Sequence, residues 1–242
     1  EFYMAYQVQL RLSDNTYVGA EALLRWHNKQ LGIIPPNHFI PIIENSFYIN
    51  QLTLMVVKKV IEDITPHIKK LPINFRVSIN LTEFDLNNDF IINQILELID
   101  LSDVPNHFFA FEITESNYID NIDKTNRIIE RFHQADIIMA IDDFGTGYSS
   151  INYLKSMHVD QVKIDRTFIE KYPNHDDGAM FETMANLIHS LGKEVIAEGT
   201  ETKEQIDFCV QNHCEMIQGY YISKPIVFDQ LIKQFFNKKD ID

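Results

Sequence analysis

Short apolar runs alternate along the chain with longer stretches in which apolar residues recur every three or four positions. Runs rich in β-branched and aromatic residues predict strands, whereas the longer periodic stretches predict helices. We therefore expect eight strands, at 3–12, 17–24, 75–79, 108–111, 137–141, 161–164, 194–197 and 216–217. Helices are expected between and after them, at 48–70, 89–100, 122–134, 150–157, 178–191, 203–212 and 229–236.

The order of these elements predicts an α/β fold of strand–helix–strand units around a parallel sheet. The length of 242 residues suits a (β/α)8 TIM-like barrel, which typically needs about 250 residues. Only Ser13-Asp14-Asn15 separates the first two strands, so we expect a hairpin, which makes the first strand antiparallel. No linker-like segment interrupts residues 1–242, so we expect one domain. Because it starts in strand-like sequence without an initiator Met, we expect it to be excised from a longer protein.

Acidic or amide residues follow the apolar run of several predicted strands, namely Asn80, Glu112, Asp142-Asp143, Glu198 and Gln218. Lys163 and Glu21 lie within two other strands. All parallel strands of a barrel open their carboxyl ends on one face, so we expect these side chains to converge there. Each residue alone could instead cap a helix or begin a solvated loop. Caps favour Ser, Thr, Asp and Asn, however, so capping does not explain the repeated Glu, Lys and Gln.

The converging residues would carry an excess of negative charge. The ammonium of Lys163 would face five carboxylates, those of Glu21, Glu112, Asp142, Asp143 and Glu198. Such an excess at short range is unfavourable unless cations compensate it. Two divalent cations would do so, and oxygen-rich ligand sets favour Mg²⁺ or Mn²⁺ over Zn²⁺. The adjacent pair Asp142-Asp143 suits a two-metal site that activates water for attack on a phosphoryl group.

The segment from Asp142 to Ser150 is the densest motif in the chain. Two glycines in three residues permit a tight backbone path, and Ser149-Ser150 could cap the next helix. Asp143-Phe144-Gly145 is similar to a kinase metal motif, but no G-x-G-x-x-G loop, H-R-D segment or G-K-[ST] loop accompanies it. A glycine turn alone does not account for the paired aspartates.

Composition and charge exclude several other classes. Hydrophobic residues make up 45% of the chain and charged residues 23%, as in a globular protein with a core. No apolar stretch is long enough to cross a bilayer, so we expect no membrane contact by this segment. The net charge of −14 argues against binding DNA or RNA duplexes, which requires a basic face. Cys209 and Cys214 form neither a disulfide framework nor a zinc pattern, so we expect reduced thiols in the cytoplasm, in a free protein or in the cytoplasmic part of a membrane-anchored one.

Taken in order and spacing, these motifs resemble the EAL domain family of cyclic di-GMP phosphodiesterases. The similarity runs from Tyr6-Gln7 to Ser223-Lys224-Pro225 and includes Glu21-Ala22-Leu23-Leu24-Arg25-Trp26. Further matching segments are Phe39-Ile40-Pro41, Ser78-Ile79-Asn80-Leu81, Glu112-Ile113-Thr114-Glu115, Val162-Lys163-Ile164-Asp165, Ala197-Glu198-Gly199 and Gln218-Gly219-Tyr220. Departures are minor, since Val8 stands where the family usually has proline and Ser46-Phe47 replaces a usual Thr-Gly. None removes an expected ligand.

The resemblance implies the metal ligands and the catalytic residues. The first ion would be held by Glu21, Asn80, Glu112 and Asp142, and Asp142 would bridge to a second ion bound by Asp143 and Glu198. Lys163 would position or polarise the attacking water. Glu198 is the better candidate for accepting its proton, because a lysine would need a markedly lowered pKa to act as a base. The division of labour between the two stays open.

The resemblance also implies contacts to substrate and to a second subunit. Gln7 and Glu201 would lie near guanine, Arg25 would point toward a phosphate, Pro225 would line the base pocket and Gln218 would order water. Glu115 would tether the loop that contains Phe144 and Gly145, and would couple substrate and metal binding to formation of a homodimer.

The resulting hypothesis is metal-dependent hydrolysis of cyclic di-GMP to linear 5′-pGpG. An alternative is a catalytically silent cyclic di-GMP receptor that signals through partner contacts. A third is a barrel enzyme that cleaves another phosphodiester. Turnover assays with each metal would separate the three.

Overall fold

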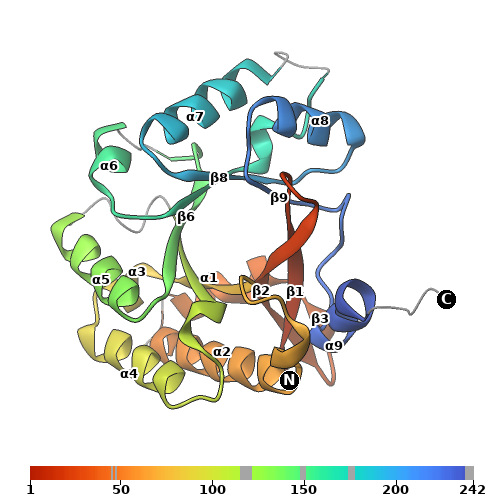
Figure 1. Ribbon diagram of the computed structural model, residues 1–242. Helices are drawn as coiled ribbons and strands as arrows, with labels where there is room; N and C mark the ends of the chain where they lie inside the picture. The colour runs from red at the N-terminus through yellow and green to blue at the C-terminus, as the bar shows by residue number, and fades with distance from the viewer. Residues whose placement is uncertain (45, 47, 115–121, 148–150, 174–177, 238–242) are drawn as a thin grey trace.

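The computed structural model describes the whole chain except residues 45, 47, 115–121, 148–150, 174–177 and 238–242. Eight of its strands close into a barrel, because β1 pairs with both β2 and β9 (Figure 1). They are β1 (Phe2–Arg11), β2 (Thr16–Asn28), β4 (Arg76–Leu81), β5 (Phe109–Thr114), β6 (Ile138–Phe144), β7 (Gln161–Ile164), β8 (Glu194–Glu198) and β9 (Met216–Gln218). The predicted TIM-like barrel is therefore confirmed.

Strand β1 is the reversed strand of this barrel. It runs antiparallel to β2 and to β9, whereas the other neighbouring barrel strands are parallel. The predicted hairpin is confirmed, with a register from Phe2 opposite Trp26 to Arg11 opposite Thr16. Its turn holds Asn15 at a φ of 54°, a left-handed conformation that asparagine tolerates. The start of β1 consequently lies at the end of the barrel where the parallel strands finish.

Helices surround the barrel in Figure 1 and cover its outer face. They are α2 (Ile49–Ile64), α4 (Asp89–Asp100), α5 (Ile122–Gln134), α6 (Ile151–Ser156), α7 (Ala179–Ser190), α8 (Lys203–Gln211) and α9 (Phe228–Leu231). Apolar spacing decides which face of a helix packs inward, and in α4 the buried positions recur on one side, at Ile91, Ile92, Ile95 and Ile99. Helix α8 begins with a capping box in which Thr202 and Gln205 satisfy each other's backbone N–H groups.

Two predicted helices are wrong in extent. The helix expected at 48–70 is α2 followed by a 3₁₀ helix, Thr65–Lys70. Pro66 has no N–H to donate back along the chain, so the α-helical hydrogen bonding is interrupted there. The helix expected at 229–236 is α9 followed by a π-helical turn, Ile232–Phe236.

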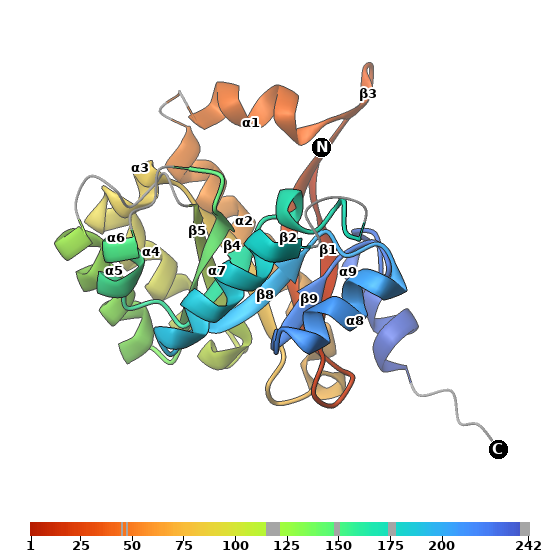
Figure 2. The same cartoon turned by 90° about the horizontal axis from the view of Figure 1, so that it is seen from above.

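Several short elements were not predicted from the sequence. They are β3 (Gly32–Ile34), α1 (Pro36–Glu44), α3 (Glu83–Leu86) and two 3₁₀ turns, Asn106–Phe108 and Arg166–Phe168. Figure 2 shows β3 and α1 standing above one end of the barrel. This is the end where the parallel strands finish, because Ile40 of α1 lines the same pocket as Asn80 and Asp142.

The inside of the barrel differs from its outside. Between strands and helices lies one large apolar core, whereas Val18, Ile196 and Met216 form a small separate cluster. Ile196 pairs in register with Lys163, so an apolar position and a buried charge lie side by side on the inner face.

Cys209 and Cys214 are both buried and free. None of the helices among the described residues is long and apolar enough to cross a bilayer.

Candidate active site

The side chain of Lys163, in the middle of β7, is fully buried at the centre of an acidic cluster. Its Nζ lies 2.7 Å from Glu112, 2.8 Å from Asp142, 2.9 Å from Glu198 and 3.2 Å from Glu21, measured to one carboxylate oxygen of each. These carboxylates come from β5, β6, β8 and β2, so the barrel brings together residues far apart in sequence. The predicted convergence is confirmed for these five residues.

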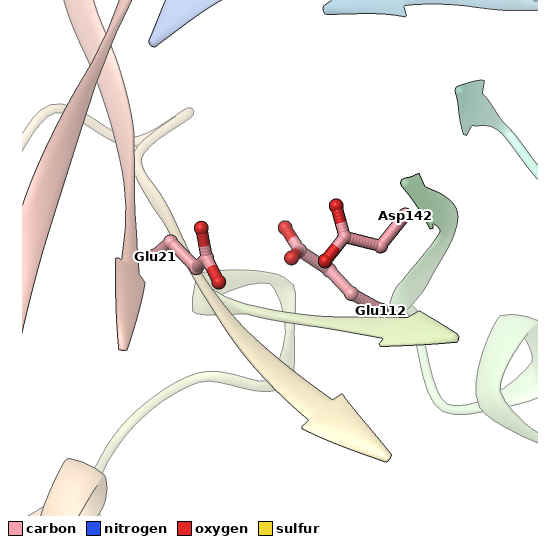
Figure 3. A group of neighbouring side chains, drawn as sticks. All are labelled: Glu21, Glu112 and Asp142. Carbon is pink, nitrogen blue, oxygen red and sulfur yellow. The ribbon is translucent and has the colours of Figure 1, made fainter. Parts of the chain in front are cut away.

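Asp142 belongs to two groups of carboxylates. Figure 3 shows Glu21, Glu112 and Asp142 pointing toward one another from three strands. Oxygen atoms of these three residues lie within 4.8 Å of one another, and so do those of Asp142, Asp143 and Glu198. Such spacing could hold a metal ion in each group, with Asp142 common to both.

An irregularity in β6 explains how two consecutive aspartates reach this site. Neighbouring residues of a regular strand point to opposite faces. Between the pairs Ile141–Val162 and Phe144–Ile164 the register shifts, so that Asp142 and Asp143 together lie opposite Lys163. Asp143 adopts a φ of 53° there. The β-bulge re-aims the Asp143 carboxylate toward the site instead of the outer face.

Two amide side chains orient Glu21. Asn80 Nδ2 donates to Glu21 Oε1 at 2.9 Å, and Gln218 Nε2 donates to Oε2 at 2.6 Å. Burial alone would raise the pKa of Glu21, but Lys163 and these two hydrogen bonds hold it below its ordinary value. Glu21 is therefore held as a carboxylate in a fixed orientation.

The other carboxyl groups are less well compensated. Burial raises the pKa of Glu112 to about 8 despite the attraction of Lys163, with repulsion from Glu21 and Asp142 adding to the effect. Burial and the charge of Asp142 likewise raise the pKa of Asp143 to about 6. The pKa of Glu198 is also well above its ordinary value, because of burial and repulsion from Asp142 and Glu21. One ammonium is thus too little positive charge for the cluster.

The pKa of Lys163 is raised as well, but for an amine this shift favours the charged form. Burial disfavours its charge, yet the four surrounding carboxylates raise its pKa well above the ordinary 10.5. The side chain is therefore held as an ammonium ion. It can donate hydrogen bonds and neutralise charge, but it has no free lone pair for a proton.

The donor set fits divalent cations. Asp142 Oδ1 is buried and lies 2.8 Å from Lys163 Nζ, yet it makes no hydrogen bond with any residue that the structure describes. A buried carboxylate oxygen in this condition is unfavourable unless another cation or donor approaches it. Carboxylate and amide oxygens without thiolates suit hard cations rather than zinc.

Two pockets open at this end of the barrel and share Asp143. One, of about 510 Å³, is lined by Arg25 and Asn80 among others. The second, of about 250 Å³, is lined by Gln7, Glu201 and other residues. The structure thus brings Arg25 from one side, and Gln7 and Glu201 from the other, to the acidic cluster. Because Asp143 lines both pockets, we treat them as one extended opening and call it the mouth.

The remaining predicted residues are less closely tied to the cluster. Pro225 is partly buried and lines neither of these two pockets. Phe144 is buried at the end of β6, and Gly145 follows at a φ of +99°, where a Cβ would meet Met184 and Phe168. Glu115 and Ser149-Ser150 lie outside the described residues.

Three site residues were missed by the sequence reasoning. Gln9 is buried and donates from Nε2 to Gln218 Oε1 at 2.9 Å. It shares a face of β1 with Gln7, and two glutamines spaced by two in an apolar strand are a signal for a polar inner face. Asp165 and Arg166 line the smaller pocket. They follow β7 directly, so the strand-end rule applied elsewhere would have found them.

Comparison with known proteins agrees with this geometry. The family model of the EAL domain matches residues 1–225. The chain belongs to the EAL domain family. This EAL domain is 32% identical to the cyclic di-GMP phosphodiesterase NbdA of Pseudomonas aeruginosa, over 91% of the chain and 28% of that protein. It is also 32% identical to the cyclic di-GMP phosphodiesterase PdeL of Escherichia coli, over 91% of the chain and 61% of that protein.

Solved structures give the same family. The phosphodiesterase PaMucR in complex with c-di-GMP superposes with a TM-score of 0.88 at 29% identity, over 95% of this EAL domain and 94% of that chain. The EAL enzyme Bd1971, in its form bound to cAMP and cyclic di-GMP, gives 0.91 at 30% identity, over 97% and 65% of the two chains. The chain spans between 28% and 61% of the length of the curated relatives NbdA and PdeL.

Proposed function

We propose that this EAL domain is a metal-dependent phosphodiesterase that hydrolyses cyclic di-GMP to linear 5′-pGpG. The observation that carries the proposal is the position of Asp142, shared by two carboxylate groups beneath an open mouth. A bridging carboxylate is the expected centre of a two-metal phosphodiesterase site. The names of NbdA and PdeL, and the c-di-GMP complex of PaMucR, support this choice of substrate.

The ligand assignment follows the two groups. Glu21, Asn80, Glu112 and Asp142 would hold one ion, and Asp142, Asp143 and Glu198 the other, with Mg²⁺ or Mn²⁺ as the ions. Bound there, such ions supply Lewis-acid polarisation of a phosphoryl oxygen and a lowered pKa for coordinated water. Asn80 would turn its amide oxygen inward, since it now donates its NH₂ to Glu21.

Lys163 and Glu198 would divide the remaining work. Because its pKa is raised far above neutrality, Lys163 serves as a hydrogen-bond donor that positions the attacking water. Glu198 lies 2.9 Å from Lys163 Nζ, and its pKa is raised by burial and by the neighbouring carboxylates. Cations bound beside it would lower that pKa and leave a carboxylate that takes the proton of the water. The geometry therefore favours Glu198 over Lys163 as the general base.

Substrate binding is assigned to the two pockets. Arg25 would pair with a phosphate from the larger pocket, where its planar fork suits bidentate contact. Gln7 and Glu201 would hold a guanine in the smaller pocket, with Pro225 near its edge, and Gln218 would order water beside Glu21. We further assign a homodimer in which Glu115, Phe144 and Gly145 couple the site to the partner, and a cytoplasmic role as one domain of a longer protein.

Turnover by the purified protein tests the proposal. With Mg²⁺ or Mn²⁺ present, linear 5′-pGpG should appear by chromatography, and Glu21→Gln should reduce the rate about 100-fold or more. Glu62→Gln, on the exposed face of α2, is the matched control and should leave the rate unchanged. If neither metal supports turnover, the proposal fails, and tight binding of cyclic di-GMP by calorimetry would then identify a silent receptor. Faster cleavage of another nucleotide in a panel would identify a different substrate.

A further inference from the structure

Another cavity opens at the opposite end of the barrel from the acidic cluster and its two pockets. Its volume is about 500 Å³, and it is bounded by the turn between β1 and β2, at the bottom of Figure 2. Small side chains on the inner face, Ala110 and Ala140, leave it room to extend into the barrel. Cavities of this size are typical of sites for small organic ligands.

Two hydrogen-bond donors in this cavity have no acceptor among the residues that the structure describes. Arg76 and Ser78 are two residues apart at the start of β4, so both side chains face the barrel interior. Ser78 is only 5% exposed, and its hydroxyl makes no hydrogen bond with any described residue. Arg76 Nε is also buried without an acceptor in the described part of the chain. Unsatisfied buried donors are costly, and this one belongs to a half-buried cation.

The acidic residues around the cavity, by contrast, already have partners. Glu194 accepts from Gln161 Nε2 at 2.7 Å, and Glu215 accepts from the Val195 N–H at 2.7 Å. Glu112, at the inner end, is paired with Lys163. Glu194 and Glu215 keep their charge, since their donors are neutral, but no described carboxylate lies within ion-pair distance of Arg76. The cavity wall therefore provides acids with hydrogen-bond partners and, at Arg76 Nε, a donor without an acceptor among the described residues.

A second cation lies nearby but is differently placed. Arg11, at the end of β1, contacts Asp14 at 3.5 Å, and both of its Nη atoms lie 3.1 Å from the Asn74 side-chain amide, which accepts from them when its oxygen is turned toward the arginine. The hydrogen bonds of Arg11 are therefore already used at the cavity rim, although its charge remains there. It would strengthen the attraction for an anion held by Arg76 without defining its position. The two arginines stand on neighbouring parts of the wall, since β1 and β4 both flank β2.

We propose that this cavity is a second binding site, for a small molecule whose carboxylate or phosphate group accepts hydrogen bonds from Arg76 and Ser78. An oxyanion would satisfy both donors at once and supply the missing counterion. The site opens at the amino-terminal end of the parallel strands, away from the proposed catalytic mouth, and only its inner end adjoins the acidic cluster, at Glu112. The proposal does not depend on the proposed activity.

The test uses metal-free protein, stripped on a chelating resin, with inorganic phosphate and succinate as probes. Each anion is titrated at constant ionic strength while the Arg76 Nε–H and the β4 backbone amides are followed by NMR. Saturable shifts at these positions are expected for at least one anion, and the responding anion tells whether phosphate or carboxylate is preferred. Arg76→Gln should weaken binding by about tenfold or more, as loss of a charged hydrogen bond implies.

Two further variants keep the test decisive. Ser78→Ala removes a hydroxyl with little change in packing, so this variant should fold, and it should bind the anion more weakly than the unchanged protein does. It therefore tests the site even if Arg76→Gln does not fold. Arg25→Gln removes a cation at the opposite end and should leave these shifts unchanged. The proposal is overturned if neither anion gives a saturable response, or if the response survives unchanged in Arg76→Gln and Ser78→Ala.

Discussion

At the scale of single residues, Lys163 holds the acidic cluster together in the metal-free protein. Lys163→Met keeps the length of the side chain but leaves four carboxylates without their counterion. Removing one partner of a buried ion pair typically costs about 3–5 kcal/mol, so a large drop in unfolding free energy is expected in chelated buffer. Urea denaturation measures it, and added Mn²⁺ should recover part of the loss.

Lys203 offers a matched control for this substitution. It pairs with Asp207 on an exposed face of α8. Lys203→Met should change stability much less, because solvent screens exposed pairs. Equal effects of the two substitutions would show that Lys163 does not stabilise the cluster by its charge.

The raised pKa values of Glu112, about 8, and Asp143, about 6, should make metal binding depend on pH. Below its pKa each carboxyl holds a proton that a cation must displace, so affinity should rise between pH 6 and 8 by up to about tenfold per pH unit for each proton. Calorimetry with Mn²⁺ across this range checks the slope. Glu112→Gln should reduce the pH dependence of the affinity near pH 8. An affinity that does not change with pH would contradict the assignment of Glu112 and Asp143 as metal ligands.

In metal-free protein, the raised pKa of Glu112 makes the folding stability fall as pH rises, whereas the affinity for metal rises with pH. The folded pKa of Glu112 is raised from 4.5 to about 8, so the stability that it contributes is complete below 4.5 and is lost as pH rises through about 8. Metal-free protein should therefore be less stable at high pH, and metal should reverse this trend. Thermal unfolding at pH 4.5 and at pH 8, with and without Mn²⁺, measures whether the metal reverses the loss of stability with rising pH.

The identities of the clustered residues were predictable, but their contacts were not. Acidic and amide residues at strand ends were enough to place Glu112, Asp142 and Glu198 at one end of the barrel. That Lys163 touches four carboxylates depends on barrel closure, which brings β2 and β7 to opposite walls of one interior. Sequence spacing within a strand carries no information about a neighbour across the barrel.

At the scale of elements, the bulge in β6 determines how Asp143 can be replaced. Its φ of 53° is tolerated by asparagine but is strained for alanine. Asp143→Asn and Asp143→Ala both remove the carboxylate and should both weaken metal binding. Asp143→Ala should in addition be about 1 kcal/mol less stable than Asp143→Asn, as measured by urea denaturation. Equal stabilities would mean that the backbone conformation places no demand on this residue.

The inner face of β1 is joined to Glu21, in the proposed active site, by a chain of hydrogen bonds. Gln9 donates to Gln218 Oε1 at 2.9 Å, and Gln218 donates to Glu21 at 2.6 Å. Gln9→Leu should free Gln218 to rotate and lower kcat for cyclic di-GMP by about tenfold, in the range seen when groups that orient metal ligands are lost. Gln161→Leu, which removes a hydrogen bond at the other end of the barrel, is the control. Unchanged kcat in Gln9→Leu would exclude this role.

Elements with strong periodicity were predicted well, and short ones were not. The helices over Asp89–Asp100 and Ile122–Gln134 have the expected bounds, because one apolar face runs through each of them. Helix α1 begins at Pro36, which the first turn of a helix accepts, but it contains Pro41 in its interior, where proline ordinarily indicates a break. In a stretch of nine residues this obscures the helical signal. The helix forms where the rings of Phe2 in β1 and Trp26 in β2 pack against Phe39, and where Ile40 lines the larger pocket.

At the scale of the whole molecule, helix α9, which lies just beyond the family match, still belongs to the core. The match ends at residue 225, yet Phe228 of α9 is 3% exposed and its ring lies 4.8 Å from that of Tyr6 in an edge contact. Phe228→Ala should cost about 3–5 kcal/mol of unfolding free energy. Val227→Ala, at a side chain 39% exposed, should cost much less. Similar losses for both would place α9 outside the cooperative unit.

The expectation of a single domain cut from a longer protein stays a prediction. The family model covers residues 1–225, and the curated relatives NbdA and PdeL extend well beyond the shared part.

The reversed direction of β1 has a consequence for anything joined ahead of it. Glu1 accepts a hydrogen bond from the His27 N–H at 3.0 Å, so the chain enters at the rim of the larger pocket, close to β3 and α1 (Figure 2). In a barrel whose strands are all parallel, an upstream polypeptide would arrive at the far end. Here an upstream polypeptide would arrive beside the larger pocket. A movement of that polypeptide would displace the rim of the pocket directly, without a conformational change passing through the barrel.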